Sequence, residues 1–166
     1  MCSSDLVDSC QGGTHRFGLS AEQVYMCVKQ SQVESGCFTK SHLRFGKHPI
    51  SSTYYVSNAD FIACHNQTYL TKYDIISELK PHGSFLLNCE WTESELEQHI
   101  PGDILKYIAE NDIKFYIIDA NKESQALGLG NRSNMVLQAA FFKLANVIPV
   151  EDAVEHMKAA DRKSVV

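Results

Sequence analysis

The sequence predicts a three-layer α/β domain with a mainly parallel sheet, because three short apolar runs alternate with helical patterns. The runs are nearly continuous in hydrophobicity, which is typical of strands covered on both faces. They are DFIACHN (60–66), SFLLNCE (84–90) and KFYIIDA (114–120). The predicted order is strand, helix, strand, helix, strand, and right-handed crossovers then place helices on both faces of the sheet.

The connecting elements follow from local signals. YLTKYDIISEL (69–79) has apolar residues at helical spacing and precedes a proline and a glycine, so it predicts a crossover helix. ESELEQHI (93–100) and DILKYIAEN (103–111) predict two helices, with Pro101-Gly102 as the break between them.

The C-terminal part predicts mostly helix. Residues 121–132 predict a short helix or loop, and residues 133–147 predict a largely buried helix with Ser133 as its N-cap. A last helix is expected within residues 147–160. The predicted core residues are Phe61, Ile62, Phe85, Leu86, Phe115, Ile117, Phe141 and Phe142.

The N-terminal part carries weaker signals. FTKSHLRFG (38–46) and STYYVSN (52–58) read as extended segments, whereas SAEQVYMCVKQSQ (20–32) is compatible with helix or strand. In SHLRFG, we expect an extended segment to separate the polar Ser41, His42 and Arg44 from Leu43 and Phe45.

Composition excludes several classes of protein. A chain of 166 residues is long enough for one domain with a substantial core, and its net charge of −5 argues against a nucleic-acid partner. No apolar stretch approaches the ~20 residues of a membrane helix, and no signal peptide is evident, so we expect a cytoplasmic protein without a membrane partner. Neither a CxxC pair nor an HExxH motif occurs, so we expect no metal site and no iron–sulfur cluster held by this chain, and the six cysteines are expected to be reduced thiols.

Both ends of the chain resemble translated sequencing-adapter DNA. MCSSDL (1–6) and DRKSVV (161–166) match such translations. We therefore expect these residues to be scars that lie outside the folded domain.

Polar residues follow each predicted strand. His65-Asn66, Asn88-Cys89-Glu90 and Asp119-Ala120-Asn121 should meet at the carboxyl edge of a parallel sheet, where open α/β folds bind ligands. The alternative is that they cap the helices that follow. Cys64 and Cys89 are interpreted as small buried hydrophobic residues.

A glycine-rich stretch, LGLGNRSNM (127–135), precedes the long helix. It lacks the third glycine of a dinucleotide-binding turn, because Ser133 stands at that position, and it does not directly follow a strand. Two interpretations stay open. One is an anion site made by the helix N-terminus and Arg132, and the other is a tight packing corner that the glycines permit.

The sequence resembles the γ-type domain of pyruvate:ferredoxin (flavodoxin) oxidoreductase from about Ser35 to Ala160. The segments that carry the resemblance are SHLRFGKHPI (41–50), STYYVSNADFIACHN (52–66), YDIISELKPHGSFLLN (73–88), IKFYIIDANK (113–122), LGLGNRSNM (127–135) and QAAFFKLANVIPVEDAV (138–154). The resemblance implies a partial Rossmann-like domain over residues 35–160, whose glycine-rich first strand–helix unit is missing. Residues 7–34 diverge from the family pattern. Near the end of this segment, Val33-Glu34 stand in place of a lysine pair, and Cys37 just after it stands in place of a glycine.

The resemblance also implies a function. The complete enzyme would convert pyruvate, coenzyme A and oxidised ferredoxin or flavodoxin to acetyl-CoA, carbon dioxide and reduced carrier, using thiamine diphosphate, Mg and 4Fe-4S clusters held in other domains or subunits. This chain would be a non-catalytic docking domain, with no catalytic residue of its own and cofactor-binding residues that the sequence does not identify. The residues expected to face a neighbouring domain or the active-site region are Ser41, His42, Arg44, His65, Asn66, Asp119, Arg132 and Asn134. The alternatives are a separately encoded γ subunit and a stand-alone module that binds a nucleotide or coenzyme A.

Overall fold

The computed structural model describes residues 14–18, 23–32, 39–48, 50, 55–130, 132–146, 149, 151 and 154–155. The chain divides into two compact units, Met1–Val56 and Ser57–Val166. In the described part, no helix is long and apolar enough to cross a membrane.

The first unit contains an antiparallel sheet of three strands in the order β1-β2-β3. The strands are β1 (Thr14–Gly18), β2 (Gln23–Gln32) and β3 (Thr39–Gly46). Residues 23–32 of the ambiguous segment are therefore a strand, and the extended segment predicted at 38–46 is confirmed over residues 39–46. Of the second predicted extended segment, residues 52–54 lie outside the described residues.

The predicted faces of SHLRFG were partly wrong. Successive side chains of a strand point to opposite faces, so Ser41 shares a face with Leu43 and Phe45, and His42 shares the other face with Arg44. His42 is buried, whereas Leu43 is 40% exposed.

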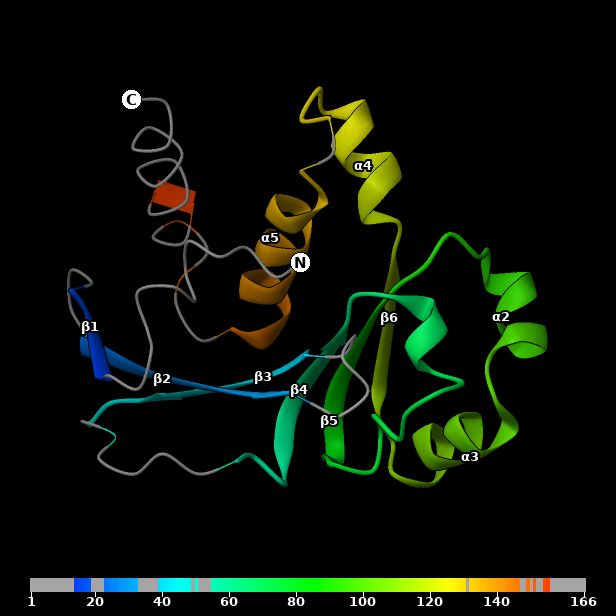
Figure 1. Ribbon diagram of the computed structural model, residues 1–166, viewed down its shortest axis with the longest axis horizontal. Helices are drawn as coiled ribbons and strands as arrows, with labels where there is room; N and C mark the ends of the chain where they lie inside the picture. Colours follow the sequence, from blue (N-terminus) through cyan, green and yellow to red (C-terminus); the bar gives the residue numbers. More distant parts are fainter. Residues whose placement is uncertain are drawn as a thin grey trace. The chain divides into compact units, whose positions relative to one another are not determined.

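The second unit contains the predicted parallel sheet, in the order β4-β5-β6 (Figure 1). The strands are β4 (Ala59–Cys64), β5 (Leu79–Asn88) and β6 (Lys114–Ile118). Helices α2 (Glu93–His99) and α3 (Gly102–Glu110) connect β5 to β6, as predicted. Helices α4 (Ala120–Ala126) and α5 (Ser133–Ala145) follow β6.

The predicted crossover helix at 69–79 is wrong. The connection from β4 to β5 contains only a 3₁₀ helix, η1 (Gln67–Tyr69), followed by turns. Two features of the sequence explain why no α-helix forms here. The run Tyr73 to Ile76 consists of weak helix formers, and the Asp74 carboxylate accepts a hydrogen bond from the Ser77 backbone N–H at 3.2 Å, which favours a turn.

Strand β5 also begins five residues earlier than the predicted run at 84–90, and it contains Pro81 and Gly83. Its register against β4 jumps from Ala59↔Leu79 to Phe61↔Ser84, so the extra residues of β5 bulge out of the ladder. His82, inside this bulge, has a φ of 62°.

The core of this unit has two parts, one on each face of the sheet. The helices α2 and α3 cover one face, where Phe85 and Leu87 of β5 are fully buried. Helix α5 covers the other face, where Leu137 packs with Leu86. Figure 1 shows the resulting three layers, with α2 and α3 on one side of the strands and α5 on the other.

The predicted core is only partly correct. Phe85 and Leu86 are buried, with exposed fractions of 0% and 1%. The other six predicted residues, Phe61, Ile62, Phe115, Ile117, Phe141 and Phe142, are half-buried. They lie on the outer strands or on α5, and only the central strand β5 has neighbours on every side.

Helix α5 begins one residue earlier than predicted. Its N-cap is Arg132, and Ser133 is the first helical residue, so Ser133 does not cap the helix. Asn131 is outside the described residues, as is most of the predicted last helix at 147–160, in which Glu151, Val154 and Glu155 are helical.

Candidate functional site

The three parallel strands end side by side at Cys64, Asn88 and Ile118, which places the polar residues that follow them at one edge of the sheet. Asn88, on the central strand, joins the loops after its two neighbours. Its Nδ2 donates to the His65 carbonyl at 3.0 Å, and its Oδ1 accepts from the Ala120 N–H at 3.0 Å. Both ends of this amide group are therefore used to hold the edge together.

The loop after β4 is held by the side chains of Asn66, which was a predicted candidate, and Gln67, which was not. The Asn66 Oδ1 accepts from the backbone N–H and the hydroxyl of Thr68, at 3.0 and 2.9 Å, and so caps η1. The Gln67 Oε1 accepts from the Glu90 N–H at 3.3 Å, which ties this loop to the one after β5. Desolvation of the imidazole lowers the pKa of His65.

The loop after β6 consists of Asp119 alone, because β6 ends at Ile118 and α4 begins at Ala120. Asp119 accepts a hydrogen bond from the Lys122 N–H at 2.9 Å and caps α4. The helix-cap interpretation of Asn66 and Asp119 therefore describes their contacts within the chain. Whether they also face a neighbouring domain stays a prediction.

The two thiols at this edge are buried. Burial raises the pKa of the Cys64 thiol to about 11, and the hydrogen bond that its Sγ donates to the Asn66 carbonyl partly offsets this rise. Burial also raises the pKa of Cys89, and the nearby Asp119 carboxylate adds to the rise. Both thiols are protonated at neutral pH, so neither is an activated nucleophile.

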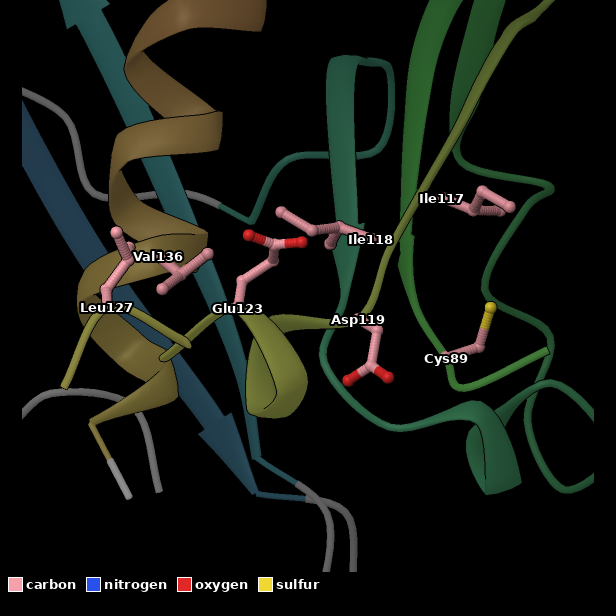
Figure 2. Close-up of a pocket in the computed structure, with 7 residues that line it drawn as sticks. All are labelled: Cys89, Ile117, Ile118, Asp119, Glu123, Leu127 and Val136. Carbon is pink, nitrogen blue, oxygen red and sulfur yellow. The ribbon is translucent and has the colours of Figure 1, made fainter. Parts of the chain in front are cut away.

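An open hollow of about 480 Å³ lies at the end of β6 (Figure 2). Its lining is Cys89, Ile117, Ile118, Asp119, Glu123, Leu127 and Val136. Figure 2 shows the Glu123 carboxylate between Ile118 and Val136, with Asp119 and Cys89 at the strand ends. The hollow combines apolar walls with two carboxylates and contains no basic side chain, so it does not fit a phosphate group.

A second hollow, of about 340 Å³, lies beside α4. It is lined by Glu90, Asn121, Ser124, Gln125 and Gly130. These groups are polar, and again no lysine or arginine is present. Among the described residues, no cluster of three or more His, Cys, Asp or Glu side chains could hold a metal ion.

The glycine-rich corner is a helix ending. The Gly128 N–H donates to the Gln125 carbonyl at 3.0 Å, and the Leu129 N–H donates to the Ser124 carbonyl at 2.8 Å. With Gly128 at a φ of 71°, these two bonds form the Schellman motif that terminates α4. The Gly128 and Leu129 N–H groups are thus already bonded within the chain, which favours the packing-corner interpretation for the glycines.

The hydroxyl of Ser124 stabilises this corner through contacts to two backbone carbonyls. It is 1% exposed, and its hydroxyl lies 2.8 Å from the Gly130 carbonyl and 2.9 Å from the Asn121 carbonyl. No sequence pattern indicated this role. A serine within a short helix gives no signal of it, because the acceptor on Gly130 is brought close only when the Schellman turn forms.

Five candidates belong to other elements. Arg132 and Asn134 lie at the start of α5, while Ser41, His42 and Arg44 belong to the first unit. His42 Nδ1 accepts a hydrogen bond from the Val56 N–H at 3.1 Å, and its ring packs on Tyr55 with 5.0 Å between centroids. The Ser41 hydroxyl is buried and has no hydrogen-bond partner in the described structure.

Comparison with known proteins gives close matches over most of the chain. A family model described as "Pyruvate ferredoxin/flavodoxin oxidoreductase" matches residues 23–166. The chain is 53% identical over 125 residues to a pyruvate-flavodoxin oxidoreductase of Enterobacter agglomerans, which covers 75% of this chain and 11% of that protein. It is 50% identical over 125 residues to a pyruvate:ferredoxin oxidoreductase of Moorella thermoacetica, again 75% of this chain and 11% of that protein.

A third relative is named as a dehydrogenase. The chain is 45% identical over 120 residues to a mitochondrial pyruvate dehydrogenase [NADP(+)] of Euglena gracilis, covering 72% of this chain and 7% of that protein. The chain thus spans about a tenth of the length of the curated relatives it matches.

Proposed function

Since the chain belongs to the pyruvate ferredoxin/flavodoxin oxidoreductase family, we propose that it is the γ-type docking domain of an enzyme that oxidises pyruvate. The complete enzyme would convert pyruvate, coenzyme A and an oxidised carrier to acetyl-CoA, carbon dioxide and the reduced carrier. Relatives named for flavodoxin and for ferredoxin support either protein as the carrier.

One observation carries the docking role. At the carboxyl edge of the sheet, where an α/β enzyme would present its reactive groups, the polar side chains of Asn66, Asn88 and Asp119 are engaged in hydrogen bonds within the chain. Cys64 and Cys89 are protonated thiols. Side chains engaged within the chain and protonated thiols have low chemical reactivity, which suits a supporting domain.

The cofactors of such an enzyme belong in this proposal to its other parts. Thiamine diphosphate and coenzyme A carry phosphates, and both hollows described above contain carboxylates without a basic partner. Mg and 4Fe-4S clusters need several ligands close together, and the described residues contain no such group. We therefore assign no step of the reaction to this chain.

The lengths of the relatives support a single long polypeptide over a separate γ subunit. In the relatives from Enterobacter agglomerans and Euglena gracilis the matching segment is only 11% and 7% of the protein. The flanking sequence of the source gene tests this directly. A reading frame that continues on both sides is expected, and a stop codon and start codon bordering the segment would indicate a separate subunit.

The proposed contacts to neighbouring domains are made by Ser41, His42, Arg44, His65, Asn66, Asp119, Arg132 and Asn134. Arginine suits such a surface because its planar guanidinium can pair with a carboxylate through two hydrogen bonds, which lysine does not do.

The test uses the full-length enzyme with Arg44→Lys or Arg132→Ala. We expect weaker assembly or slower coenzyme A-dependent turnover, with an unchanged iron–sulfur content. Lys143→Ala is the matched control, because Lys143 is an exposed cation in the last turn of the same helix as Arg132. Wild-type assembly and turnover in both arginine variants would refute the docking role. Loss of nicotinamide-nucleotide binding in Arg132→Ala would instead support a nucleotide-binding module.

A further inference from the structure

Strand β6 is the outer strand of the parallel sheet. It pairs with β5 from Ser84↔Lys114 to Asn88↔Ile118, and no strand lies on its other side in the described part of the chain. Figure 1 shows β6 at the margin of the strands β4 to β6, with α4 continuing from its end.

No strand among the described residues uses the hydrogen-bonding groups on the outer side of β6. The Ile118 carbonyl accepts from the Cys89 N–H at 3.0 Å, so Ile118 turns its backbone groups toward β5. In a parallel ladder the residues of one strand alternate between the two neighbouring strands, and Tyr116 therefore also faces β5. It follows that Phe115 and Ile117 direct their N–H and C=O groups away from β5.

The outer edge of β6 lacks the usual protection against strand pairing. Edge strands commonly carry charges, prolines or bulges that prevent another strand from adding. On the other outer strand, β4, the ladder shifts register between Ala59 and Phe61, and Asp60 forms a salt bridge of 2.7 Å with Lys80. In β6 the register is regular, and four apolar residues, FYII, follow Lys114.

We propose that an extended segment from another part of the full-length enzyme adds to β6 as a further strand. Only a backbone offers the alternating N–H and C=O groups that match those of Phe115 and Ile117, so the partner is a β-strand and not a helix or a small molecule. This proposal rests on the proposed function, in which the chain is one part of a longer polypeptide.

The same polypeptide is a better source of this strand than a second copy. The chain spans only 11% of the relative from Enterobacter agglomerans, so most of such an enzyme lies outside it. A segment tethered to the same polypeptide is present at an effective concentration on the order of millimolar, whereas a second copy must bind from solution. A strand of five residues offers few hydrogen bonds and therefore gains most from tethering.

Amide hydrogen exchange tests the proposal in the full-length enzyme. Mass spectrometry with electron-transfer fragmentation would resolve single amides. Tyr116 and Ile118 serve as internal controls, since their N–H groups face β5 whether or not another strand is present. We expect the amides of Phe115 and Ile117 to be protected to a similar degree, roughly 100-fold or more below the rate of an unstructured peptide.

Two results would overturn the proposal. Fast exchange of Phe115 and Ile117 beside slow exchange of Tyr116 and Ile118 would mean that the edge is open in the complete enzyme. Protection that decreases on dilution would indicate pairing between copies. Acetyl-CoA formation from pyruvate is measured on the same sample. An inactive but protected enzyme would count against the proposed function alone, and an active enzyme with fast exchange would count against the added strand alone.

Discussion

The side chain of Asn88 holds two loops with the two ends of one amide group. An aspartate would keep the acceptor for the Ala120 N–H but lose the donor to the His65 carbonyl, and an alanine would lose both. The two hydrogen bonds at the edge of the sheet thus require an asparagine at position 88. Sequence patterns indicate only that a polar residue ends this strand.

We predict that Asn88→Ala weakens the carboxyl edge by about 1–3 kcal/mol, because the His65 carbonyl and the Ala120 N–H each lose a partner. Hydrogen exchange of the Cys89 amide, which donates to the Ile118 carbonyl, would measure this change locally. Gln98→Ala on the exposed surface of α2 is the control and should have no effect there. Unchanged exchange in Asn88→Ala would contradict the bridging role.

Cys64 gives a second prediction at this scale. Burial raises the pKa of its thiol from 9.0 to about 11, so the thiolate fraction at neutral pH falls by about 100-fold. Alkylation by iodoacetamide should therefore be about 100-fold slower than for the same cysteine in the denatured chain. The raised pKa also means that the folded state loses stability as the pH rises above 9.0, since the unfolded chain releases this proton more easily. Rapid labelling of Cys64 in the folded chain, mapped by mass spectrometry, would contradict the prediction.

At the scale of elements, the bulge in β5 depends on Gly83. A Cβ at this position would lie 2.8 Å from the Lys80 carbonyl oxygen and 2.9 Å from the Leu79 side chain. Because one of these atoms belongs to the backbone, the bulge would have to move to accept a methyl group.

We predict that Gly83→Ala lowers the free energy of unfolding by about 1–3 kcal/mol. Gly102→Ala is the matched control, because Gly102 is in the first turn of α3 and a Cβ added there would have no atom within 4 Å. This control should be neutral or stabilise the fold by about 0.4–1 kcal/mol. Urea titration of the dilute chain, followed by the fluorescence of Trp91, its single tryptophan, would compare the two. Equal midpoints would show that the bulge adapts freely.

Helix α2 gives a prediction on pH. Its capping box pairs Thr92 with Glu95, whose carboxylate accepts hydrogen bonds from the Thr92 N–H and hydroxyl at 2.9 and 2.8 Å. These bonds lower the pKa of Glu95 below 4.5. The contribution of the box is therefore complete above pH 4.5 and disappears as the pH falls through the lowered pKa of Glu95.

The amides at the start of α2 should accordingly exchange faster in Glu95→Gln than in the parent chain at pH 6, after correction for intrinsic rates. The difference should shrink as the pH falls through the lowered pKa of Glu95, because the parent carboxylate then also becomes protonated. Glu97→Gln is the control, since Glu97 is exposed and is not part of the capping box. A difference between the two chains that does not depend on pH would argue against the charged hydrogen bonds.

Sequence patterns predicted the elements that depend on local signals. The apolar runs of β4, β5 and β6, the break at Pro101-Gly102 and the helices around it all carry such signals. The connection at 69–79 was mispredicted as a helix. Leu70 and Ile76 are buried although they lie in turns, and the spacing of apolar residues alone does not distinguish buried turns from a helix. The bonds of Asn88 and Ser124 depend on residues distant in sequence or on a turn, so no local pattern reports them.

At the scale of the whole molecule, the outer edge of β6 is an expected site of association between chains. An unprotected apolar edge strand is a site for pairing between chains. We predict that the isolated chain associates as its concentration rises, and that Tyr116→Lys reduces this association, because Tyr116 is 37% exposed on β6 and a lysine there would repel a second copy.

Static light scattering over a concentration series would measure the association. Leu127→Lys is the control, because it removes a leucine that is 66% exposed in the turn after α4 and adds the same charge. If both variants reduce association equally, general surface hydrophobicity and not the strand edge is the cause.

The order of the strands in the parallel sheet has a consequence for synthesis on the ribosome. Because β4, β5 and β6 are neighbours in the same order as in the chain, each strand that leaves the exit tunnel finds its partner already made. No later strand of this sheet has to insert between two strands that are already paired. The nascent sheet can therefore grow by addition of strands at one side. Of its three strands, β6 emerges last, and its outer edge is the one at which a further strand of the same polypeptide can add.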